Sequence, residues 1–211
     1  LLHHSAAVQK LALQLIKENA YTETVPVLRT MLSKQENIAI LPFVISTLAS
    51  LKADEDLSFF IQHPDEQVAD AAIAAQLHSH LEENRKTAID TTRKWLLASA
   101  VADNKKAAKI LSSVYIPAFD DHIIQGMHHD DQHVKQYMFK AAGLSQNAAL
   151  SDALIKAYPV TVNDQAILEA LQSNGSVALP AIRNFLFLQD CHGTKSRKLI
   201  SILGKISNED A

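Results

Sequence analysis

A stripe of apolar residues at positions i, i+3, i+4 and i+7 recurs about every 32 residues along this chain of 211 residues. This spacing places the apolar side chains on one face of an α-helix. A repeat with such a period indicates a fold built from stacked, similar units. The stripes begin at Val8, Ile38, Val68, Ala107, Val134, Ile167 and Leu199. The stripe at Ile167 lacks its fourth apolar member, because Asn174 stands there.

Residues that cap helices precede most of these stripes. All but one of the residues three positions before a stripe are types preferred at helix N-termini. The segments 63–68 and 129–134 also share a His, an acidic turn and an apolar entry residue, so we expect the same turn at both places. The seven capping positions hold Ser5, Gln35, Asp65, Asn104, Asp131, Asp164 and Ser196.

The composition favours helices throughout, because the chain has only 5 Gly and 6 Pro. We expect Pro42 and Pro180 to kink the helices that contain them. The sequence predicts an all-α chain of helix pairs, each too small to bury its apolar face alone, which is an α-solenoid. An irregular helical bundle is the alternative. Further apolar helical segments lie between the stripes, at residues 25–32, 88–97, 117–124, 150–158 and 179–188.

Several segments resemble HEAT repeats, and the resemblance covers essentially the whole chain. It implies an ARM-type fold, a right-handed α-solenoid of about six to seven HEAT-like helix pairs that forms a single domain over residues 1–211. The longer interval between Val68 and Ala107 departs from this pattern and indicates an insertion around residues 81–86. The matching segments are 61–68 with the following Ala71 and Ala72, 134–143, 177–182 and 197–206.

The order of these segments also resembles the soluble HEAT region of bacterial membrane proteins of the nucleotide-translocase-like, major-facilitator type. This resemblance implies a fragment of a longer bacterial chain, on the cytosolic side of a transporter. HEAT proteins usually present curved surfaces to other macromolecules and perform no chemistry. The resemblance thus implies a cytoplasmic, non-enzymatic scaffold for protein–protein interaction or regulation, without a cofactor. Its partners would be another protein or flanking domains of the same chain.

Both ends of the chain fall on the first helix of a pair, so the outermost apolar faces lack the polar capping units of free-standing solenoids. We therefore expect flanking domains or self-association through these ends.

Other features count against several classes of protein. The single cysteine, Cys191, excludes a disulfide framework and fits a reducing compartment. The longest apolar run, 38–45, is far shorter than the ~20 residues of a membrane-spanning helix. A net charge of −3 counts against a dedicated nucleic-acid binder. The sequence has no phosphate-binding loop, no zinc-protease or hydrolase motif, and no His-Glu dipeptide of the kind that marks HEAT-like di-iron hydroxylases.

Two groups of residues invite a chemical interpretation. The His- and Asp-rich segment 122–133 could hold a metal ion if its side chains converged, but most of it falls on a loop and a first helical turn. Cys191 and His192 could form a thiolate and its base, although sequence neighbours rarely do so, and a plain loop cysteine is favoured. We expect His78 and His80 to contact carbonyls at a helix end. No catalytic or metal-binding residue is predicted.

The strongest charge asymmetry lies between residues 85 and 109, where seven basic residues stand against two acidic ones. One interpretation is a basic groove for nucleic acid or anionic lipid, as in the HEAT-like DNA glycosylases, with an aromatic ring for stacking. The other, which we favour, is a solvated helix face. On the first interpretation, the alternative function is a HEAT-like nucleic-acid-binding enzyme that uses the segment 85–109. The candidate binding surface comprises Arg85, Lys86, Arg93, Lys94, Trp95, Lys105, Lys106 and Lys109.

Overall fold

A computed structural model describes residues 5–35, 37–53, 55–161, 164–188 and 193–209. These residues form helices and contain no strand, which confirms the all-α prediction. The contacts divide the chain into two compact units, Leu1–Thr92 and Arg93–Ala211, and the division falls inside helix α6 (Glu82–Leu96). Each unit is described below by itself.

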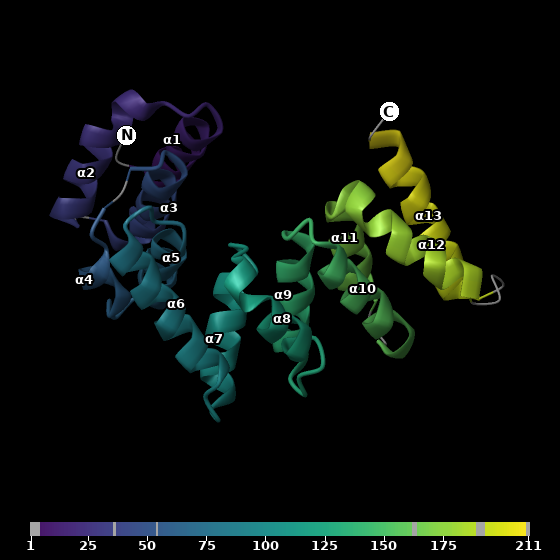
Figure 1. Ribbon diagram of the computed structural model, residues 1–211. Coiled ribbons are helices and arrows are strands. Elements are labelled where there is room, and N and C mark those ends of the chain that lie inside the picture. The colour runs from purple at the N-terminus through teal and green to yellow at the C-terminus, as the bar shows by residue number, and fades with distance from the viewer. Residues whose placement is uncertain (1–4, 36, 54, 162–163, 189–192, 210–211) are drawn as a thin grey trace. The chain divides into compact units, whose positions relative to one another are not determined.

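In unit 1, helix α3 packs against α1 and α2 on one side and against α5 on the other, and α4 covers α5 (Figure 1). Its helices before α6 are α1 (Ala6–Glu18), α2 (Val25–Lys34), α3 (Leu41–Ser50), α4 (Ser58–Ile61) and α5 (Glu66–Leu77), with short 3-10 turns at η1 (Thr22–Thr24) and η2 (Ile38–Ile40).

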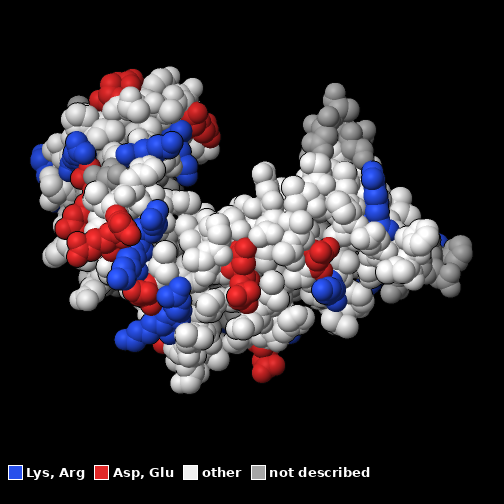
Figure 2. Space-filling view, in the orientation of Figure 1, with Lys and Arg blue, Asp and Glu red and all other residues white. Residues whose placement is uncertain are grey.

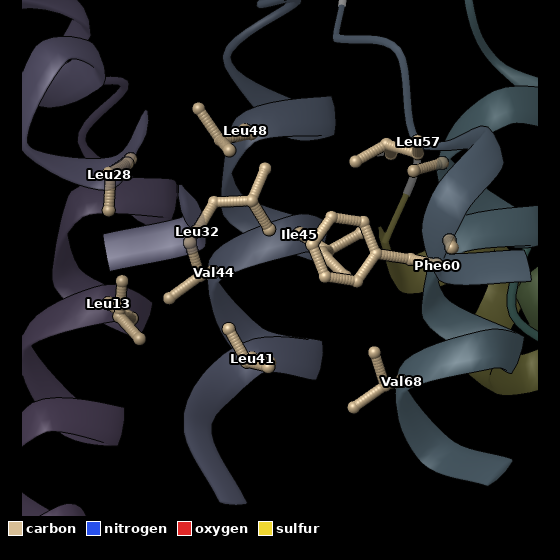
Figure 3. Packing of buried hydrophobic residues seen from close by; sticks show 12 residues of the cluster. Leu13, Leu28, Leu32, Leu41, Val44, Ile45, Leu48, Leu57, Phe60 and Val68 are labelled. Atoms are coloured by element: carbon tan, nitrogen blue, oxygen red, sulfur yellow. The ribbon is translucent and has the colours of Figure 1, made fainter. Parts of the chain in front are cut away.

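The core of unit 1 forms around α3 (Figure 3). Leu28 of α2 lies on one side of this helix and Phe60 of α4 on the other, with Val44 and Ile45 between them. Complete burial of one such side chain contributes roughly 1.5 to 3 kcal/mol to stability. Helix α3 is buried on both sides, and the apolar residues around most of its circumference allow this.

In unit 2, alternate helices pack in a row: α7 against α9, α9 against α11, and α11 against α13. A second set lies alongside, with α8 and α12 both in contact with α10 (Figure 1). These helices are α7 (Val101–Leu111), α8 (Asp120–Gly126), α9 (Gln132–Gly143), α10 (Ala148–Ala157), α11 (Gln165–Ser173), α12 (Leu179–Leu188) and α13 (Thr194–Glu209), with 3-10 turns η3 (Pro117–Phe119), η4 (Tyr158–Val160) and η5 (Gly175–Ala178).

The apolar stripes identify the buried face of the later helices but not of α1. The residues that begin the stripes of α5, α7, α9, α11 and α13 are buried. In α1, however, Leu11 of the predicted stripe is 58% exposed, whereas Leu13 is 1% exposed. Helix α1 is apolar on two faces, and among the helices it packs mainly on α3. That contact determines which face is buried.

The two predicted turns have the same structure, which confirms the prediction. Asp65 accepts hydrogen bonds from the backbone N–H groups of residues 67 and 68, and Asp131 does so from residues 133 and 134. In both turns the preceding histidine also accepts: Asp65 N–H donates to Nδ1 of His63 at 3.1 Å, and Asp131 N–H donates to Nδ1 of His129 at 2.9 Å.

Other local predictions are wrong. Asn104 and Ser196 lie inside α7 and α13 instead of capping them, and Gln35 ends α2 with a φ of 50°. Pro42 and Pro180 are the second residues of α3 and α12. Proline fits the first helical turn because its missing N–H needs no partner there, so neither residue kinks its helix.

Candidate binding surface

The predicted basic surface lies on both sides of the division between the units. In unit 1, Arg85 and Lys86 are exposed on α6, in the turn that follows Glu82 and Glu83. Figure 2 shows basic and acidic side chains interspersed over unit 1. This half of the predicted surface is therefore mixed in charge.

In unit 2, much of the predicted surface is used for packing. The Lys106 ammonium lies 4.5 Å from the centre of the Trp95 ring, a cation–π contact between α7 and the end of α6. Lys105 forms an ion pair with Asp131 at 2.8 Å. This pair, more than the backbone bonds of Val134 and His133, holds the pKa of Asp131 below its ordinary value. Lys106 therefore occupies one face of the Trp95 ring.

The buried Asn104, which sequence reasoning assigned to a cap, organises this part of unit 2. Its Nδ2 donates to the carbonyl oxygens of Trp95, Leu96 and Ala98 at 2.9 to 3.1 Å, at the C-terminal end of α6. Its Oδ1 lies 3.3 Å from Nε2 of His129. Since Nδ1 of His129 accepts from a backbone N–H, the ring proton must lie on Nε2 and be donated to Asn104.

The histidine-rich segment 122–133 serves packing and turn formation. His122 meets the Phe119 ring edge-on, with centroids 5.9 Å apart, and His129 occupies the turn described above. Among the residues that the structure describes, no three His, Cys, Asp or Glu side chains converge in a metal-binding arrangement. His78 ends α5, where its backbone N–H donates to the carbonyl of Ala75, and the N–H of Ser79 donates to the carbonyl of Gln76. Cys191 and His192 lie outside the described residues.

The described residues also line hollows that the sequence did not predict. An open groove of about 470 Å³ lies in unit 1 between α2 and α4, where Phe59 is 73% exposed. A second open groove of about 470 Å³ lies in unit 2, between the helix ends at Met127 and Ala157 and the first turns of α9. The third is a small cavity of about 30 Å³ in unit 1, lined by Gln76. No periodicity reveals such sites, because they depend on how helices distant in sequence meet.

No family model matches this chain, and no curated protein matches it. In the described part of the chain, no helix combines the length and the apolar character needed to cross a membrane.

Proposed function

We propose that the chain is a HEAT-type, right-handed α-solenoid of about six to seven helix pairs in a single domain. The packing within each unit supports this proposal, because each helix of the main row contacts the next member of that row: α1, α3 and α5 in unit 1, and α7, α9, α11 and α13 in unit 2. The repeated turn at Asp65 and Asp131 supports it independently.

We further propose that this solenoid is a non-enzymatic scaffold for protein–protein interaction. The main support for this proposal is the groove between α2 and α4. Leu32 and Phe60 contribute buried apolar side chains to it, Phe59 stands exposed at its rim, and Arg29 and Glu55 pair across one end. An apolar surface with a charged rim is typical of a site for a protein segment.

The test is affinity purification from an extract of the source organism with the full chain and two variants. Phe59→Asp places a charge in the groove, whereas Leu97→Asp changes an exposed apolar residue elsewhere and serves as the control. We expect a protein captured by the wild type to be lost with Phe59→Asp and retained with Leu97→Asp. The purified partner should then bind with at least tenfold lower affinity to Phe59→Asp. Equal affinity for all three proteins would argue against this groove.

The resemblance to transporter-associated HEAT regions also leads us to propose a cytosolic location within a bacterial membrane protein. The parent open reading frame tests this proposal. We expect it to encode membrane-spanning helices beside the present segment, and a frame without them would refute the proposal.

Nucleic-acid binding is the weaker alternative, because Trp95, Lys105 and Lys106 already have partners within unit 2. Fluorescence anisotropy of labelled duplex DNA at low salt distinguishes the two functions. We expect no binding. Salt-dependent binding that is lost on changing Arg85 and Lys86 to Ala would favour the alternative.

A further inference from the structure

Helix α1 has an exposed apolar face. Val8, Leu11 and Leu15 are 45%, 58% and 48% exposed, and they occupy positions i, i+3 and i+7 of this helix. That spacing places all three side chains on one side of the helix. Leu13, on the opposite side, belongs to the core around α3. The helix therefore has one apolar side in the core and a second apolar side at the surface of unit 1.

The two lysines of α1 lie away from the exposed face. The Lys10 ammonium lies 4.6 Å from the centre of the Phe43 ring of α3, and the Lys17 ammonium donates to the Ser46 hydroxyl of α3 at 3.4 Å. The third charged residue of α1 is Glu18, at its C-terminal end. A surface helix normally turns its charged side outward. In α1 this order is reversed, which is typical of a face that another apolar surface covers.

The equivalent face of α5 is covered by its neighbour in the row. Its stripe begins at Val68 and continues through Ala72 and Ala75, and these three residues belong to the core around α3 (Figure 3). The stripe of α5 thus packs against the preceding member of its row. Since α1 carries the same stripe, its exposed face is the one on which a further helix of this kind docks.

This face is complementary to itself. In an antiparallel pair centred between Leu11 and Ala12, Val8 of each helix lies opposite Leu15 of the other, and Leu11 lies opposite Ala12. The same pairing places Glu18 beside the first turn of the other α1. That turn carries no acidic residue, and the positive end of the helix dipole attracts the carboxylate. No like charges meet between the two faces.

We propose that two copies of this chain pair through α1, as antiparallel helices related by a two-fold axis. The face formed by Val8, Leu11, Ala12 and Leu15 is the contact, and it joins the helix rows of the two copies into one longer row. This pairing does not involve the groove between α2 and α4, so it stands or fails separately from the function proposed above.

Analytical ultracentrifugation of the full chain tests the pairing. One helix pair forms a small, reversible interface, so the measurement covers chain concentrations from about 5 to 500 µM. We expect the average mass to rise toward that of a dimer and no further, because a two-fold contact closes at two copies. A monomer at every concentration would overturn the proposal and leave the face to a different partner. Growth into longer polymers would also overturn it, because polymers need a head-to-tail contact.

Two variants of the face and two controls locate the contact. Leu11→Glu brings two carboxylates together at the centre of the pair, so we expect association to weaken roughly tenfold or more. Leu15→Glu should act in the same way. Both residues are exposed, so circular dichroism should show unchanged helix content. Phe59→Asp and Leu97→Asp change exposed apolar residues elsewhere and should associate like the wild type. Wild-type association of Leu11→Glu and Leu15→Glu would overturn the proposal, as would loss of association in Phe59→Asp alone.

Disulfide cross-linking tests the antiparallel order, with Cys191→Ser as the background. Cysteines introduced at position 11 lie next to the two-fold axis, within the ~7 Å between Cα atoms that a disulfide can span. At position 15 they lie about 10 Å apart along the helix axis. We expect Leu11→Cys to yield a covalent dimer on mild oxidation and Leu15→Cys to yield none. Cross-linking at both positions would indicate parallel helices and overturn the proposed arrangement.

Discussion

Single polar side chains tie helices together in unit 2. Asn104 binds three carbonyls at the end of α6, and Lys195 does the same further along. The Lys195 ammonium donates to the carbonyls of Tyr158, Pro159 and Thr161 at 2.7 to 3.0 Å, while the Tyr158 hydroxyl donates to the Lys195 carbonyl. The carbonyls at a helix end lack partners within the helix, so a donor from another helix both caps the first helix and fixes the position of the second.

We expect Asn104→Ala to lower the free energy of unfolding by about 2 to 3 kcal/mol, because three carbonyls and Nε2 of His129 lose their partner in a buried place. Urea denaturation measures the change. Asn19→Ala is the matched control, since the Asn19 amide makes one exposed hydrogen bond to a helix-end carbonyl, and it should cost no more than about 0.5 kcal/mol. Equal losses in the two variants would show that the network around Asn104 contributes little.

Tyr158 should make unit 2 sensitive to alkali. Burial, followed by the charge of Asp164, raises the pKa of Tyr158 from its ordinary 10 to about 12. The folded state therefore holds the phenol proton more tightly than the unfolded state does. The resulting stability is complete below pH 10 and is lost as the pH rises toward 12. Denaturation midpoints measured across this range should fall less steeply in Tyr158→Phe than in the wild type. If the denaturation midpoints of the two proteins fell equally as the pH rose, the raised pKa of Tyr158 would be contradicted.

At the scale of the helix, the sequence predicts the role of a side chain correctly when the partners of that side chain lie within one helical turn of it. The caps of Asp65 and Asp131 follow from residues two and three positions ahead, so their pattern is visible in the sequence. Asn104 has the same residue type as a cap, but its partners lie on α6 and beyond α8. For that reason sequence reasoning assigned it the wrong role.

Close packing of α9 on α11 depends on Gly143. A Cβ atom at this position would lie 2.7 Å from Cα of Ala170, too close for the helices to keep their separation. We expect Gly143→Ala to destabilise the protein by at least 1 to 2 kcal/mol, roughly the cost of overpacking a core, in spite of the better helix propensity of alanine.

Gly204 of α13 supplies the matched control, because a Cβ there meets no atom within 4 Å. Gly204→Ala should stabilise the protein by about 0.5 to 1 kcal/mol. Thermal denaturation of the two variants should give shifts in Tm of opposite sign. Shifts of the same sign would show that propensity, and not the contact with Ala170, governs position 143.

At the scale of the whole molecule, we expect packing between neighbouring helices to make stability a local property. Leu28 belongs to the core of unit 1 and Leu154 to unit 2, and both are fully buried. We expect Leu28→Ala to cost about 2 to 5 kcal/mol and to accelerate amide hydrogen exchange in α1 to α5. Exchange in α9 to α13 should stay unchanged, and Leu154→Ala should give the reverse pattern. Equal acceleration in both units would indicate one cooperative structure.

The amino-acid sequence alone determined the helical class and the turns that begin α5 and α9. Each of these depends on residues within about one helical turn of each other. Tertiary structure decided which face of α1 is buried, why Asn104 points inward and how Gln76 comes to line a cavity. Those outcomes depend on atoms brought together from separate helices, and no local pattern contains that information.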